Sequence, residues 1–439
     1  MTIAMNENFK ISELESVFNN KLTENGDRSH YSTGNKLADL LFQSEYYTKN
    51  IGAVTPDMIG STPYEKVFAM FMRDPRFGMG RRDLGRRLMQ LAGCPASAVV
   101  AAGRWDDLFH VFPIETAAAE FRPAIEANDQ LAKKWAPRYS SKNLMTARAF
   151  AKLWGMNKQQ YGKFVKADTV ERCLTEKNTD QINFEHVPSL ALIKYWKRFM
   201  AGSDTGERFK RYVDSVKKGT AKINTSVTNV YDIYRNRSKI DPDAVYDNLE
   251  KISGSWLPIV DTSGSMWSDD AIGKALSIGK YLADTSTYCP RTFITFSSRP
   301  QLVKLEDAPY NQQIDKMSRA DWGSNTDFGA VMRMLSGLKR DFPEYLVVMS
   351  DMEFDYGSAN DKDVLMRGWR QQGINTKIVW WNFNARNKTA PETDKYGNIF
   401  MSGYNPTLLK YMESGFNNDQ FIENLLKNYI TKVQAQYLK

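Results

Sequence analysis

The stretch Trp256-Leu257-Pro258-Ile259-Val260-Asp261-Thr262-Ser263-Gly264-Ser265 decides the fold of the second half of the chain. Its first five residues are a short apolar run with the length and composition typical of a buried strand. Similar runs occur at 292–296, 345–349 and 377–383, and amphipathic helical stripes at 272–282 and 328–338 lie between them. This alternation predicts a parallel, doubly wound α/β sheet.

Polar residues with a D-x-S-x-S spacing follow the first of these strands: Asp261, Ser263 and Ser265. The segment resembles the metal-ion-dependent adhesion site of von Willebrand factor A domains. That resemblance implies two further ligands, a threonine in a later loop before a helix and an aspartate after a later strand. Thr326 and Asp351 stand at those places. The full set is much more specific than D-x-S-x-S alone.

The oxygen chemistry of this set suits magnesium, or manganese in its place. Mg²⁺ takes six oxygen ligands in an octahedron and keeps water where few carboxylates are offered. Three hydroxyls and two carboxylates, bound directly or through water, leave one position for an acidic group of a partner. Trp267 and Trp322 flank the ligand positions and either rim the metal or pack beneath the loops. The alternative, that these residues only cap the next helix, does not account for Thr326 and Asp351.

The sequence before residue 250 has a helical pattern instead, in which apolar residues recur at spacings of three and four positions. Apolar stripes occur at 192–199 and at 209–216, and Gly219 is placed to end the second helix. Further helices are expected around 34–44, 62–73, 81–92, 116–135 and 143–154. We therefore predict an N-terminal domain of packed helices of the HEAT-like α-solenoid type over residues 1–250, followed by an α/β domain over residues 251–439.

Positive charge is concentrated in one part of the helical half. Residues 131–240 carry 23 Lys+Arg and 9 Asp+Glu, whereas 1–130 and 241–439 each have a net charge of −3 within a total of +8. Such a segment is typical of a surface that binds a polyanion, although solvated lysine-rich helices give the same count. Seven residues on the two striped helices, outside the apolar stripes, are candidate RNA contacts: Lys194, Lys197, Arg198, Lys210, Arg211, Lys217 and Lys218.

The whole layout resembles the TROVE family of Ro ribonucleoproteins, in which a helical-repeat domain precedes a von Willebrand factor A domain. A closer resemblance is to a poorly characterised family of viral, bacterial and plant proteins. The segments that carry the closer resemblance are Tyr31–Asn35, Gly78–Arg82, Gly103–Asp107, Asn183–Ser189 and Lys222–Asn224. The TROVE resemblance implies that a basic helical domain binds structured small RNA. In the Ro family that domain is a closed ring of helices.

Composition excludes several classes of protein. No apolar run approaches the roughly 18 residues of a membrane span, and no secretory signal is visible, so we expect a cytoplasmic protein without a membrane partner. Three cysteines and three histidines offer little for a disulfide framework, a zinc site or a hydrolase triad, and we expect no enzyme. Two functions stay open: an RNA-binding protein, or a scaffold that captures a partner carboxylate at the metal site.

Overall fold

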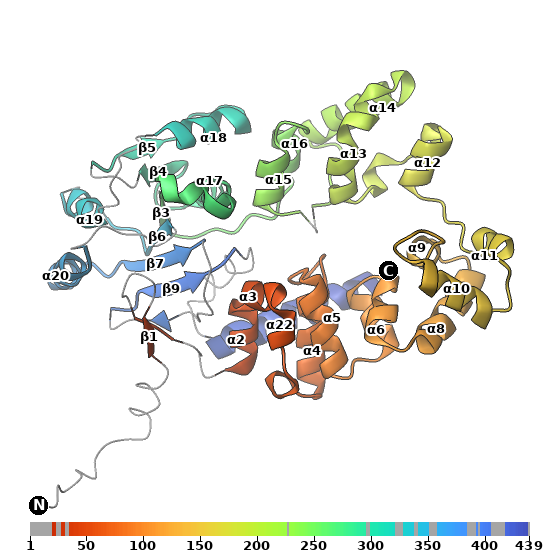
Figure 1. Cartoon of the computed structure of the whole chain (residues 1–439). Helices are drawn as coiled ribbons and strands as arrows, with labels where there is room; N and C mark the ends of the chain where they lie inside the picture. Colours follow the sequence, from red (N-terminus) through yellow and green to blue (C-terminus); the bar gives the residue numbers. More distant parts are fainter. Residues whose placement is uncertain are drawn as a thin grey trace, which may run out of the picture. The chain divides into compact units, whose positions relative to one another are not determined.

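The protein is described by a computed structural model. The structure describes residues 20–22, 28–30, 35–225, 228–295, 299–320, 328–337, 341–350, 358–383, 392–393, 396–404 and 418–437. Most of its helices and strands are labelled in Figure 1. A helical region is followed by a largely parallel sheet with helices, which confirms the α plus α/β class expected from the sequence.

The chain forms two compact units, each built from three segments. The α/β unit comprises Met1–Tyr46, Val230–Arg235 and Lys251–Phe421. The helical unit comprises Tyr47–Asn229, Asn236–Glu250 and Ile422–Lys439. The domain boundary between residues 250 and 251 stays a prediction, because short segments from each side of it belong to the unit on the other side.

The α/β unit contains a seven-stranded sheet within the described residues, in the order β5-β4-β3-β6-β7-β9-β8. The strands are β3 Trp256–Val260, β4 Thr292–Thr295, β5 Leu302–Lys304, β6 Tyr345–Ser350, β7 Lys377–Asn382, β8 Glu392–Thr393 and β9 Ile399–Ser402. The four predicted strands are β3, β4, β6 and β7, and all four pair in parallel, as does β9 with β7. The short edge strands β5 and β8 are antiparallel and were not predicted.

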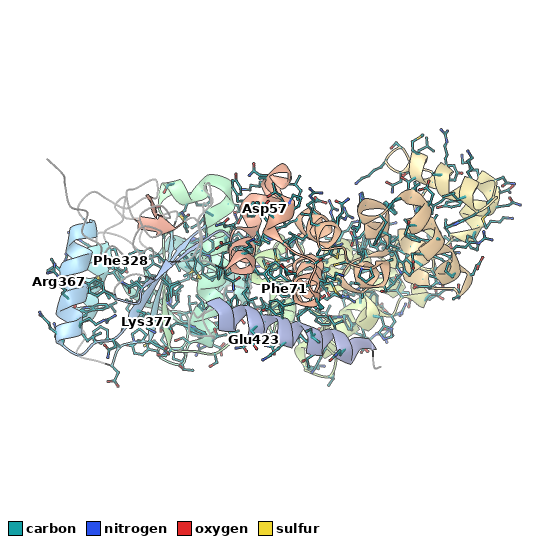
Figure 2. All side chains as sticks on the ribbon, turned by 90° about the horizontal axis from the view of Figure 1, so that it is seen from below. Asp57, Phe71, Phe328, Arg367, Lys377 and Glu423 are labelled. Atoms are coloured by element: carbon teal, nitrogen blue, oxygen red, sulfur yellow. The ribbon has the colours of Figure 1, made fainter. Side chains whose placement is uncertain are left out.

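Helices cover both faces of this sheet, as the doubly wound prediction requires. They are α17 Ala271–Thr285, α18 Tyr310–Arg319, α19 Phe328–Ser336 and α20 Ser358–Gln371. A Cβ on Gly279 of α17 would lie 2.6 Å from Cγ2 of Val260, so α17 lies on the Val260 face. On the other face Phe328, labelled in Figure 2, has its ring centroid 4.5 Å from that of Trp380 in β7. Both faces of β3 are therefore buried.

Shorter elements complete the α/β unit: the pair β1 Asn20–Leu22 and β2 Arg28–His30, helix α2 Lys36–Phe42, helix α15 Val230–Asn236 and the 3₁₀ segment η6 Gly264–Asp270. Helix α2 is the predicted helix near 34–44; Asn35 caps it by accepting from the backbone N–H groups of Leu37 and Ala38. Helix α3, Ser44–Lys49, lies where the two units divide.

The helical unit is a succession of short helices in which neighbours along the chain pack together. They are η1 Ile51–Ala53, η2 Pro56–Met58, α4 Pro63–Arg73, α5 Arg82–Leu91, α6 Ala96–Ala102, η3 Trp105–Asp107, α7 Leu108–Val111, α8 Ile114–Glu126, α9 Gln130–Trp135, α10 Leu144–Leu153, α11 Lys158–Phe164, α12 Val170–Glu176, η4 Thr179–Gln181, η5 Phe184–His186, α13 Ser189–Ala201, α14 Ser203–Lys217, α16 Pro242–Tyr246 and most of α22 Asn418–Tyr437.

Most helices begin and end near their predicted residues, with one correction. The single helix expected over 116–135 is two, α8 and α9, because Asn128 adopts a left-handed conformation with φ 66°. Asp129 then starts α9 by accepting from the N–H groups of Leu131 and Ala132. Gly219 has φ 73° directly after α14, as predicted for a helix-ending glycine.

The last helix packs inside the helical unit on a helix from the start of the chain. Figure 2 shows α22, which carries the labelled Glu423, running beside α4, which carries Phe71. The ring of Tyr429 on α22 meets that of Phe71 edge to face at 5.5 Å, and its hydroxyl lies 3.3 Å from Oδ2 of the buried Asp74. This long-range contact joins α22 to α4 in the core of the helical unit.

The close approach of α17 to the sheet gives a stability prediction. Gly279→Ala should destabilise the protein by about 1–3 kcal/mol, because the new methyl group would overlap Val260 in a packed core. The matched control is Gly368→Ala in α20, where a Cβ meets no atom within 4 Å. That control should stabilise by about 0.5–1 kcal/mol through helix propensity. Urea unfolding followed by circular dichroism measures both, and equal effects in the two variants would contradict the packing described.

Candidate functional site

The carboxyl ends of β3 and β6 meet at the point where the strand order of the sheet reverses. From β3 the chain moves to β4 on one side, and it later returns to β6 on the other side of β3. In open parallel sheets this arrangement leaves a crevice where ligands bind. Asp261 follows β3 directly, and Ser350 is the last residue of β6. The predicted metal loop therefore starts at the place where this fold offers a site.

The Asp261 carboxylate is fully buried and held on both oxygens. Its Oδ1 accepts from the backbone N–H of Ser263 at 2.8 Å, and its Oδ2 accepts from the hydroxyl of Ser350 at 2.6 Å. Its own N–H donates to the carbonyl of Met349 at 3.0 Å, which extends the ladder between β3 and β6 by one residue. These bonds fix the orientation of the carboxylate.

The two predicted serine ligands lie side by side. Ser263 Oγ and Ser265 Oγ are 3.0 Å apart, and both side chains are half-buried. Two adjacent ligands of an octahedral Mg²⁺, each roughly 2.1 Å from the ion, are themselves about 3 Å apart. In this structure the two hydroxyls are hydrogen-bonded to each other, and their spacing and oxygen chemistry are also compatible with two adjacent ligands of magnesium or manganese.

The other two predicted ligands, Thr326 and Asp351, lie outside the described residues, as does Trp322. Within the described part of the chain no group of three His, Cys, Asp or Glu side chains is placed to hold a metal. That finding leaves the predicted set untested, because two of its members are not described and the remaining ones include two serines. Trp267, on η6, is 59% exposed, which places much of its indole surface outside the core.

A tyrosine that sequence reasoning missed binds the end of η6, the segment that follows the predicted ligands Asp261 and Ser263. The Tyr231 hydroxyl donates to the Asp270 carboxylate, where η6 ends in a left-handed residue with φ 55°. Nearby, a Cβ on Gly273 would lie 2.4 Å from Cε1 of Tyr234, so α15 packs closely on the start of α17. The sequence signal was the pair of tyrosines on one helical face, in a segment assigned to the helical half.

The seven predicted RNA contacts lie on two helices that pack against each other. The ring centroid of Phe209 on α14 is 4.9 Å from Trp196 and 5.2 Å from Phe199 of α13. The predicted apolar stripes face this contact, with Tyr195 and Tyr212 half-buried and the other members buried. Burial of the stripes leaves all seven cations exposed to solvent: Lys194, Lys197, Arg198, Lys210, Arg211, Lys217 and Lys218.

Three of the seven are partly engaged within the protein. Lys194 Nζ lies 4.9 Å from the ring centroid of Tyr195. Lys217 Nζ forms a 2.5 Å ion pair with Asp241, whose hydrogen bond raises the pKa of the lysine. Arg198 donates to the carbonyl of Leu174 at 3.1 Å. On α14 the exposed Asp214 lies three or four residues from each of the four basic positions, which dilutes the positive potential of that helix.

The segments Gly78–Arg82 and Gly103–Asp107 have structural roles. Asp107 is completely buried and binds Arg73 at 2.7 Å and Arg86 at 2.5 Å, which joins α4, α5 and η3. Gly103 leaves room for it, since a Cβ there would lie 2.1 Å from its Oδ2. The N–H groups of Gly78 and Gly80 both donate to the carbonyl of Asp74, so they form a turn rather than a phosphate-binding loop.

Comparisons with known proteins match two separate parts of the chain to family models. Residues 255–436 match a family model described as a domain of unknown function, DUF7788, and residues 128–252 match another, DUF2828. No curated protein matches the sequence. Among solved structures the chain is similar to the crystal structure of the Deinococcus radiodurans RO (RSR) protein, with 11% identity, a TM-score of 0.36, and coverage of 90% of this chain and 93% of that chain. So low a similarity carries no argument, and the proposals below depend on the residues of this chain.

Proposed function

We propose that the protein binds structured small RNA through the basic surface of its helical unit, and that its α/β unit holds one Mg²⁺ at the carboxyl end of β3. A ribonucleoprotein role of the Ro type is the interpretation that joins the two. The observation that carries it is the separation on α13 and α14 of buried apolar stripes from seven exposed cations. Phosphate groups are the natural partners of such a surface.

The proposed metal site is a second, independent part of this proposal. When bound, the ion would supply a positive charge and an open position for an acidic group. Ser263 and Ser265 would donate hydroxyl oxygens, and Ser350 and the Ser263 N–H would orient the Asp261 carboxylate. Thr326 and Asp351 are proposed to complete the set. We propose no catalytic step at this site.

The scaffold function remains the second candidate because Trp267 is largely exposed two residues after Ser265. An apolar ring beside an acid-binding ion suits a protein partner that offers a carboxylate. The two candidates differ in what copurifies. If the protein binds RNA, nucleic acid should copurify with it and be removed by a high-salt wash. If it is a scaffold, another protein should copurify with it, and that protein should be retained only when Mg²⁺ is present.

The metal assignment predicts a change in thermal stability. Mg²⁺ or Mn²⁺ should raise the melting temperature of the protein by mass action, and Ser265→Ala should reduce that rise by removing one ligand. Asp261→Ala should abolish it, although loss of a buried carboxylate that accepts two hydrogen bonds can itself destabilise the fold. Ser277→Ala is the matched control, since its buried hydroxyl donates to a carbonyl of its own helix. A full Mg²⁺-dependent rise in both the Ser265 and the Asp261 variants would rule out this site.

The basic helix pair predicts a salt-dependent affinity for RNA. Lys194, Lys197, Lys210 and Lys218 should be changed together to Glu; Lys217 is left in place because reversal would set it against Asp241. The fold should survive, since all four side chains are exposed. Affinity for a duplex-containing RNA should fall, and the slope of log affinity against log salt should flatten by about 0.9 for each phosphate that the variant no longer neutralises. Equal affinities and slopes for variant and parent would show that this face is only solvated charge.

A further inference from the structure

A second stretch of the helical unit is more strongly basic than the predicted helix pair. Between Asp129 and Asp168 the sequence contains nine Lys or Arg residues and no Asp or Glu. The chain as a whole has nearly balanced charges, 59 basic and 51 acidic. The stretch folds as α9, α10 and α11, and α10 and α11 are neighbours in Figure 1.

This stretch has its own apolar contacts, which determine where its cations point. Trp154 and Tyr161 stack with ring centroids 5.5 Å apart, and the Tyr161 hydroxyl donates to the carbonyl of Pro137 at 2.7 Å. Trp154 Nε1 donates to the carbonyl of Ala118 in α8 at 3.2 Å. On α10, Ala147, Phe150 and Ala151 are buried, so the opposite face is presented to solvent.

Most of the nine cations are exposed and lack a carboxylate partner among the described residues. Lys134 and Lys166 form ion pairs with Glu171 and Glu176 at 3.5 and 3.9 Å, and Lys133 donates to the Asn128 side chain at 2.5 Å. The other six are exposed and form no ion pair with any described residue: Arg138, Lys142, Arg148, Lys152, Lys158 and Lys163. We call these six the α10 surface. Lys158 Nζ also lies 5.6 Å from the ring centroid of the half-buried Tyr139.

Unneutralised charge of one sign opposes folding, and a bound polyanion removes that cost. Six of the seven cations of α13 and α14 likewise form no ion pair with a described residue, but the exposed Asp204, Glu207 and Asp214 stand among the cations of α14, and Lys217 is paired with Asp241. Arg148 and Lys152 stand one turn apart on the solvent face of α10, where each can reach a phosphate. The α10 surface is therefore the stronger candidate for contact with a phosphate backbone.

We propose that the α10 surface binds the phosphate backbone of RNA, largely without regard to sequence, and supplies more of the affinity than α13 and α14. This inference rests on the proposed function. A membrane fits less well, because an interfacial helix needs a large exposed apolar face and the apolar face of α10 is buried. The exposed large apolar side chains of α10 are Met145, at 74%, and Leu153, at 47%. An acidic protein would need an apolar patch for the centre of an interface, and these two side chains provide little.

The experiment compares two charge reversals of equal size in the full-length protein. Variant one changes Arg148, Lys152 and Lys163 to Glu, and variant two changes Lys194, Lys197 and Lys210 to Glu. The probe is a labelled RNA hairpin with a single-stranded tail, titrated over a salt series, and circular dichroism checks that each variant keeps its fold. Variant one should lose roughly two to three units of salt slope and bind at least about tenfold more weakly, with a smaller loss in variant two.

The outcomes separate this inference from the proposed function. If the parent protein binds the hairpin and variant one matches it in affinity and slope, the α10 surface is not the contact, and RNA binding itself still stands. If the parent binds no RNA under any salt, both proposals fail. Two further arms use phosphatidylserine vesicles and polyglutamate as competitors. Each competitor is compared with unlabelled hairpin at equal total charge. If either one displaces the labelled RNA as efficiently as the hairpin does, the assignment to nucleic acid is overturned.

Discussion

The burial of apolar faces decides where this chain leaves its polar groups. In the α/β unit both faces of β3 are covered, Ile259 on the side of α19 and α20 and Val260 on the side of α17. A strand enclosed in this way can present polar side chains only at its ends. Asp261, the first residue after the strand, is therefore held in place by the ends of its neighbours rather than by the sheet faces.

The same constraint acts differently on the helices. A helix that buries one stripe leaves its other face to solvent, so the stripes of α10, α13 and α14 fix which cations are exposed. In another part of the helical unit, the buried Asp107 joins α4, α5 and η3. With Arg73 and Arg86 it satisfies charges far from water, and burial lowers the pKa of the Arg73 guanidinium against the opposing effect of Asp107. Removal of one partner from such a group is costly.

Periodicity predicted the elements with long apolar patterns and missed those defined by distant contacts. The run at 345–349 became β6, and the stripe at 209–216 became the buried side of α14. The edge strands β5 and β8 are too short to show a pattern, and pairing with β4 and β9 defines them. The split of 116–135 depended on one left-handed residue, Asn128, in a sequence that otherwise reads as a continuous helix.

The candidate sites, like the fold, could be predicted from the sequence only in part. The D-x-S-x-S spacing located Asp261 and both serines, but Ser350 and Tyr231 come from separate elements and carry no motif. Charge counting located the basic region, yet it gave no means of seeing that Lys217 is paired with Asp241 or that the six cations of the α10 surface form no ion pair with a described residue. Those distinctions depend on side chains that meet only after folding.

The central claim, that the helical unit is the part of the chain that contacts RNA, is tested most directly by ultraviolet crosslinking followed by mass spectrometry. Crosslinks should fall in peptides from residues 130–218, chiefly those of α10, α11, α13 and α14. High salt should remove them, because phosphate contacts weaken as counterions compete. Crosslinks confined to residues 251–421, or none at a concentration where a known RNA-binding control is labelled, would contradict the account.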